Sequence, residues 1–139
     1  MKTPFERKSI WALIGLTIIT LGLYQVFWFI NRTDAINKFS RSEKLNKNVF
    51  IAALVLVVIS LVLDIYSGFS AETIKVVLNN FSGVFQIVGS IIIIVQAFTV
   101  RKIFNDKYEG KKGIHFNAFW TFFLTYIYLQ YKINEISEM

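Results

Sequence analysis

Four apolar runs separated by polar segments form the pattern of this chain. They cover residues 10–30, 49–69, 81–100 and 114–133. Each run is close to the roughly 20 residues that an α-helix needs to cross a bilayer. The second run is the richest in aliphatic side chains, whereas polar residues such as His115 and Lys132 lie near the ends of the fourth. The pattern predicts an all-α integral membrane protein, a small bundle of about four hydrophobic helices.

A short amphipathic stretch precedes the third run. Ile74, Val77, Leu78 and Phe81 follow the i, i+3, i+4, i+7 spacing of one helix face. Ser70 is a suitable residue to cap the beginning of such a helix. We therefore expect a separate helix over residues 70–81 that lies at the membrane interface.

The composition agrees with a membrane protein. Of the 139 residues, 55% are hydrophobic and only 17% are charged, which is too apolar for a soluble domain of this size. The first run is also too long for the hydrophobic core of a signal peptide, so we expect it to remain attached. The whole chain, residues 1–139, is expected to form a single membrane domain.

The net charge of +6 comes from basic residues that cluster between the apolar runs. Residues 31–48 and 101–113 each contain five Lys or Arg, and the connection after the second run contains only Lys75. If all four runs cross the membrane, the positive-inside rule places both basic loops in the cytoplasm and both termini outside. This is the arrangement we prefer, because a charge-free run of about 20 residues normally crosses and a single glycine does not break it.

A second arrangement stays open. If the first and fourth runs turn back inside the membrane or lie in its interface, fourteen basic residues fall on one side and one on the other. The charge asymmetry favours this re-entrant arrangement, whereas the length of the runs favours four crossings. Non-helical backbone at that depth would have to be shielded by protein.

A polar and aromatic stripe follows one face of the first run. Thr20, Tyr24, Trp28 and Asn31 are spaced by four, four and three residues, and Gly22 lies beside them. Trp and Tyr anchor helices at membrane interfaces, and Thr and Gly permit close helix contact. We therefore interpret the stripe first as an interfacial belt with a packing seam, and second as a ligand site. The fourth run has a similar face, so the two could pack together; its residues are Thr121, Thr125, Tyr128 and Glu135.

Two stretches carry a resemblance to a known family. They are IITLGLYQVFWFINRTDAIN in the first run and LTYIYLQYKINEI in the fourth. The chain resembles the uncharacterised bacterial membrane-protein family called domain of unknown function four-two-three-four, in which a T-L-G-x-Y-x-x-x-W-F pattern opens the domain and a Y-L-Q-x-x-I-N element closes it. Gln25 departs from the small or apolar residue expected at its position. The resemblance implies the fold and a multi-pass location in the bacterial cytoplasmic membrane, and it implies no activity.

We interpret the remaining polar residues of the runs as residues at the membrane interface or in helix contacts. Asp64 lies near the end of the second run, where an interfacial position is favoured over a proton or cation site. The third run has a polar and small face that fits helix packing, with glutamines bonding across the contact, and alternatively a water-lined path. This face contains Ser82, Gln86, Gly89, Ser90, Gln96 and Ala97.

These features favour a protein that works by binding. The chain has no cysteine and a single histidine, so we expect no enzyme activity, no metal site and no cofactor. The predicted partners are anionic lipid head groups at loops 31–48 and 101–113, and the protein itself or another membrane protein, without nucleic acid. The alternative is a small oligomeric transporter or channel. The candidate residues are Thr20, Gly22, Tyr24, Trp28, Asn31, Asp64, Gln86, Gln96, Tyr128, Gln130 and Asn134.

Overall fold

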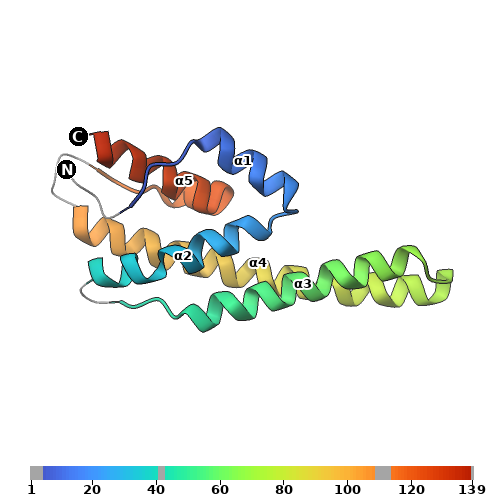
Figure 1. Ribbon diagram of the computed structural model, residues 1–139. Coiled ribbons are helices and arrows are strands. Elements are labelled where there is room, and N and C mark those ends of the chain that lie inside the picture. The colour runs from blue at the N-terminus through green and yellow to red at the C-terminus, as the bar shows by residue number, and fades with distance from the viewer. Residues whose placement is uncertain (1–4, 41–42, 109–113, 139) are drawn as a thin grey trace.

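The computed structural model describes residues 5–40, 43–108 and 114–138 (Figure 1). All regular secondary structure in these ranges is helical, as predicted, but there are five helices where about four were expected. They are α1 (Ile10–Ile19), α2 (Leu23–Phe39), α3 (Lys47–Gly68), α4 (Glu72–Tyr108) and α5 (Ala118–Glu138).

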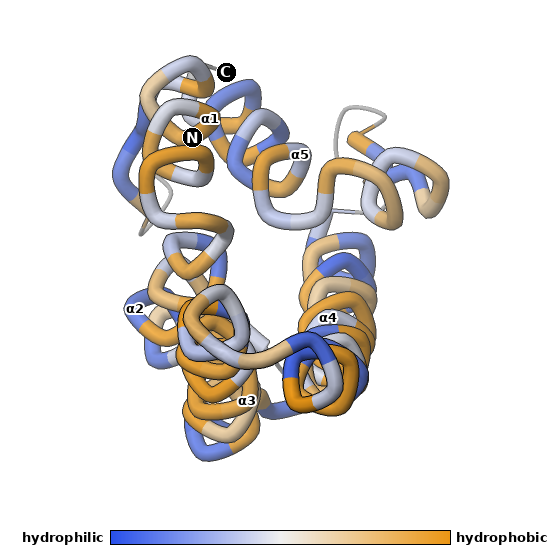
Figure 2. Tube along the Cα trace, turned by 90° about the vertical axis from the view of Figure 1, so that its right-hand side faces the viewer, coloured by the Kyte–Doolittle hydropathy of each residue, from blue (hydrophilic) through white to orange (hydrophobic). Residues whose placement is uncertain are grey.

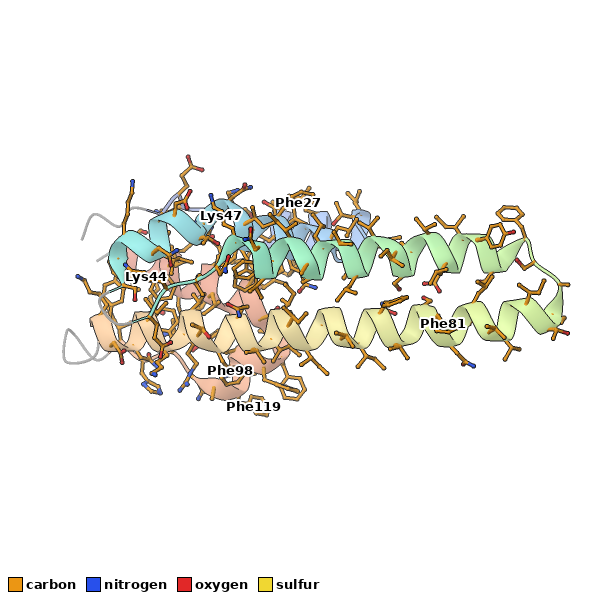
Figure 3. All side chains as sticks on the ribbon, turned by 90° about the horizontal axis from the view of Figure 1, so that it is seen from below. Phe27, Lys44, Lys47, Phe81, Phe98 and Phe119 are labelled. Carbon is orange, nitrogen blue, oxygen red and sulfur yellow. The ribbon has the colours of Figure 1, made fainter. Side chains whose placement is uncertain are left out.

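Helices α3 and α4 form a long antiparallel hairpin (Figures 1 and 3). Within the described residues, these two helices alone are long and apolar enough to cross a membrane. At 1.5 Å per residue, α3 is about 33 Å long and α4 about 55 Å, against about 30 Å of bilayer hydrocarbon. The separate interfacial helix expected over residues 70–81 is wrong. It is the first part of α4, because no proline lies between Glu72 and Tyr108 and the two glycines of this segment, Gly83 and Gly89, keep helical backbone.

Small residues bring the two helices of the hairpin together. The Ser60 and Ser82 hydroxyls lie 3.0 Å apart, and a Cβ at Gly89 would lie 3.1 Å from a methyl of Val57. Ala97 is fully buried on the same side of α4. Gln86 is exposed, so the expectation that the glutamines bond across this contact is wrong for Gln86. The contact is made by small side chains, which let the backbones approach closely.

The first apolar run is broken into two helices. Leu21 and Gly22 have φ values of 50° and 87°, which reverse the chain between α1 and α2. The Leu21 amide donates to the Ile18 carbonyl at 3.2 Å and the Gly22 amide to the Thr17 carbonyl at 2.8 Å. This pair of bonds is the Schellman motif that ends helices. The expectation of an unbroken helix over residues 10–30 is therefore wrong, and α2 runs back toward the end where α1 began (Figure 1).

The fourth run is also interrupted. Thr125 has φ 40° and ψ −116°, which divides α5 into two helical pieces that meet at a kink. Figure 2, which looks along the hairpin from its free end, shows α1 and α5 together on one side of α3 and α4. The first and fourth runs thus differ from the straight spanning helices that their length indicated.

Aromatic side chains fill the core where α1, α2 and α5 meet the hairpin. The rings of Phe29 and Phe50 stack with centroids 5.2 Å apart, and those of Phe104 and Phe116 do the same at 5.2 Å. A second set of apolar side chains projects away from this core, and Figure 3 shows Phe27 and Phe119 among them. This outward set on α1, α2, α5 and their connections consists of Trp11, Leu16, Ile18, Ile19, Leu21, Phe27, Phe119, Trp120, Phe122, Phe123, Leu124 and Tyr131.

Replacing Gly22 by alanine should destabilise the break between α1 and α2. A methyl group there would meet only the Gln25 side chain, at an ordinary 3.9 Å, so the cost comes from the positive φ. This cost is about 1–2 kcal/mol for a residue with a Cβ. Gly15→Ala is the matched control, because Gly15 lies inside α1 with open space around it, and alanine there should stabilise by up to about 1 kcal/mol.

Equilibrium unfolding in mixed micelles, followed by circular dichroism, measures both changes. A Gly22→Ala variant as stable as Gly15→Ala would mean that α1 and α2 form one continuous helix in the protein.

Candidate functional site

The two segments that carry the family resemblance meet in the interior. The Trp28 indole N–H donates to Oε1 of Gln130 at 3.1 Å, and both side chains are buried. The Tyr126 ring lies 5.7 Å from that of Trp28 and 6.2 Å from that of Tyr24, measured between centroids. Helices α2 and α5 are therefore joined by a buried hydrogen bond within an aromatic cluster.

Gln130 and Asn134 extend this contact to the segment that precedes α1. The Gln130 amide donates to the Glu6 carbonyl at 3.2 Å and to Oδ1 of Asn134 at 2.8 Å. The Asn134 amide donates to the Lys8 carbonyl at 2.7 Å. Gln130 and Asn134 are four residues apart and therefore lie on one face of α5. Together they bind the backbone of residues 6–8 to that face.

Arg32 completes the network from α2. Its guanidinium donates to the Glu6 carbonyl at 3.2 Å and lies 4.9 Å from the centroid of the Trp28 ring. The side chain is 93% buried, with 7% exposed. Burial lowers the pKa of Arg32, and the nearby negative charge of Glu6 opposes that shift. No carboxylate of the described residues lies within ion-pair distance of it.

A cavity of about 300 Å³ opens beside this guanidinium. Lys8 is one of its lining residues, and the Lys8 ammonium donates to the Tyr24 hydroxyl at 3.4 Å. The lining combines two cations, one carboxylate and one amide; its residues are Phe5, Glu6, Lys8, Asn31, Arg32 and Ala35. The cavity thus offers polar groups of both charges, with the Phe5 ring 5.8 Å from the Arg32 guanidinium.

The structure gathers some of the predicted candidate residues and leaves others apart. Tyr24, Trp28, Asn31, Gln130 and Asn134 lie in or beside the network described above. Other candidates form the break between α1 and α2 or lie elsewhere. Thr20 and Gly22 belong to the break. The Tyr128 hydroxyl accepts a hydrogen bond from the backbone N–H of Asn117 at 2.9 Å. Asp64, Gln86 and Gln96 lie on the hairpin of α3 and α4.

The sequence places Arg32 only among the five basic residues of the predicted loop 31–48. The signal that could have found it is its position four residues after Trp28, which places a guanidinium over an indole on one helix face. The exposed Asp64, in contrast, lies near the free end of the hairpin.

The segments that carry most of the described basic residues lie toward the end of the molecule that holds both termini (Figure 1). Some are paired, since Lys47 meets Asp34 at 2.6 Å and Lys102 meets Glu43. The hydrogen bond that the Lys102 ammonium donates to the Glu43 carboxylate, together with the charge of that carboxylate, raises the pKa of Lys102. Lys75 alone of the described basic residues lies near the opposite end, and the others are Arg7, Lys8, Arg32, Lys38, Lys44, Lys47, Arg101, Lys102, Lys107 and Lys132.

Comparison with known proteins gives one match. Residues 8–136 match the model of the family described as Domain of unknown function (DUF4234). This confirms the resemblance drawn from the two sequence stretches. No curated protein and no solved structure matches the chain. The matched range contains the network residues from Lys8 to Asn134 and begins two residues after Glu6. Among the described residues, no group of three His, Cys, Asp or Glu could hold a metal ion.

Proposed function

The chain belongs to the DUF4234 family, a domain of unknown function, and from its geometry we propose a non-enzymatic integral membrane protein that works by binding. In this proposal α3 and α4 cross the cytoplasmic membrane of a bacterium. The other helices stay on the cytoplasmic side and present a basic surface to anionic lipid and to a partner, either a second copy or another membrane protein.

The distribution of charge along the hairpin carries this proposal. Basic residues collect at the end with both termini, and Lys75 is the single described one at the free end. The positive-inside rule places such a basic end in the cytoplasm. With two crossings, the N-terminal tail lies on the same side as the loops, so its basic residues no longer conflict with the rule.

The break at Leu21 and Gly22 supports a re-entrant first run. The ten residues of α1 span about 15 Å, which is half of the roughly 30 Å hydrocarbon thickness. Trp11 and Ile19 are 82% and 79% exposed, and lipid would cover these side chains. The hairpin of α1 and α2 would then enter one leaflet and return. The interrupted α5, with Phe123 63% exposed, is suited to the same leaflet.

Anionic lipid should be enriched around the basic end. Each basic residue near an acidic leaflet contributes about 1 kcal/mol, so removing two costs at most about 2 kcal/mol, or about 30-fold in lipid preference. We expect Lys44→Gln with Lys107→Gln to lower the retained ratio of phosphatidylglycerol to phosphatidylcholine several-fold. The measurement is the lipid content of nanodiscs formed from vesicles that contain equal amounts of the two lipids.

Lys75→Gln is the control, because it removes one basic residue from the opposite end. It should leave the ratio unchanged. A double variant that retains the wild-type ratio would contradict lipid binding at the two basic loops.

A further inference from the structure

The cavity beside Arg32 lies at the mouth of the hairpin formed by α1 and α2. From Gly22, α2 needs ten residues, or about 15 Å, to reach Arg32, and α1 covers the same length from Ile10. Arg32 therefore returns to the level of the segment before α1, as its bond to the Glu6 carbonyl shows. If the apex of the hairpin lies at the bilayer midplane, as the proposed function has it, this cavity lies at the level of the lipid head groups.

The cations in the cavity are suited to a phosphate. One Arg32 donor is bound to the Glu6 carbonyl, and the guanidinium has further N–H groups beside the cavity. Stacking on the Trp28 ring holds this group in place. Lys8 adds a second cation and Asn31 adds an amide donor. Guanidinium and ammonium groups form short, strong hydrogen bonds to phosphate oxygens.

Glu6 adds the opposite charge to the same wall. Its side chain is exposed and its charge acts on Arg32, yet no ion pair joins the two. A phosphate held by Lys8 and Arg32 alone would have this carboxylate as an unfavourable neighbour. A head group that carries an ammonium beside its phosphate would satisfy all three charges.

We infer that this cavity binds the head group of a phosphoethanolamine lipid. The phosphate lies between Lys8 and Arg32, the ammonium of the ethanolamine lies against Glu6, and the acyl chains extend along the outer surface of α1. The inference rests on the proposed membrane placement of the α1 and α2 hairpin. It differs from lipid attraction by the basic loops, because it assigns one lipid molecule to one cavity.

Native mass spectrometry of the full chain released from detergent micelles tests the assignment. The probes are phosphatidylethanolamine, phosphatidylcholine and phosphatidylglycerol with the same acyl chains, and inorganic phosphate. We expect one phosphatidylethanolamine to bind the wild type about tenfold more tightly than phosphatidylcholine, because only the primary ammonium donates hydrogen bonds to Glu6.

Three variants in the cavity and one control outside it separate the parts of the site. Lys8→Gln should weaken the binding of phosphatidylethanolamine about tenfold, through the loss of one charged contact to the phosphate. Glu6→Gln should remove the preference for phosphatidylethanolamine over phosphatidylglycerol. Lys38→Gln, on the same helix as Arg32 but outside the cavity, should change the affinity less than twofold. Arg32→Gln should weaken binding most, and circular dichroism checks that this variant is folded.

Equal effects of Lys8→Gln and Lys38→Gln would overturn the site and leave lipid attraction by the loops in place. Inorganic phosphate that binds as tightly as the lipid would also overturn it, since the cavity would then take a free anion. Failure of the proposed function shows separately, as a phosphatidylglycerol ratio that Lys44→Gln with Lys107→Gln leaves unchanged.

Discussion

A single cysteine in place of Ser70 should react from outside the cell, while single cysteines in place of Arg7, Lys38, Lys107 and Ser137 should stay unlabelled. Ser70 lies at the free end of the hairpin, between α3 and α4. Arg7 precedes α1, and Lys38, Lys107 and Ser137 lie at the ends of α2, α4 and α5, which are near the termini in Figure 1. If only α3 and α4 cross, the whole end that holds both termini is cytoplasmic.

The chain has no cysteine, so each variant contains one reactive thiol. Intact cells are treated with a membrane-impermeant maleimide, and permeabilised cells serve as the control for accessibility. Four crossings would instead expose Arg7 and Ser137 on the same side as Ser70. Labelling of all three positions in intact cells would therefore restore the arrangement preferred from the length of the runs, and would contradict the re-entrant hairpin.

Trp28→Ala should cause the largest loss of stability among single substitutions in the described part of α2. The side chain is 2% exposed and packs against Phe29 and Tyr126. Truncation of a buried tryptophan to alanine costs about 3–5 kcal/mol. The variant also removes the donor to Gln130 and the ring under Arg32, so the polar groups around it lose their partner.

Two further variants separate packing from hydrogen bonding. Trp28→Phe keeps a ring but loses the N–H, and it should lower the free energy of unfolding by about 1–3 kcal/mol. Trp11→Ala is the matched control, since Trp11 is 82% exposed, and it should change stability by about 0.5 kcal/mol or less. Unfolding in mixed micelles measures all three. Equal losses for Trp28→Ala and Trp11→Ala would show that the α2 and α5 contact does not stabilise the fold.

The hydrophobic pattern by itself predicted an all-helical chain and the position of α3. An aliphatic run without breakers is helical in either lipid or a protein core, so its neighbours matter little. The two motif stretches likewise identified the family, which the match over residues 8–136 confirms. The end of α4 could not be predicted, because hydropathy falls at residue 101, where the third run ends, whereas the helix continues to Tyr108. Polar side chains alone do not end a helix; it ends where the backbone leaves the helical conformation.

Only the tertiary structure decided how the first and fourth runs are folded. Leu21 adopts φ 50°, a conformation that costs a leucine energy, and its side chain is 70% exposed, so contacts elsewhere in the molecule hold α1 and α2 in place. Those contacts join distant residues, as in the Trp28 bond to Gln130 and the Asn134 bonds to Lys8. Helical periodicity places each residue on one face of its helix, but it does not determine which other helix packs against that face. The buried position of Arg32 follows from the same contacts, because it depends on the return of α2 to the start of α1.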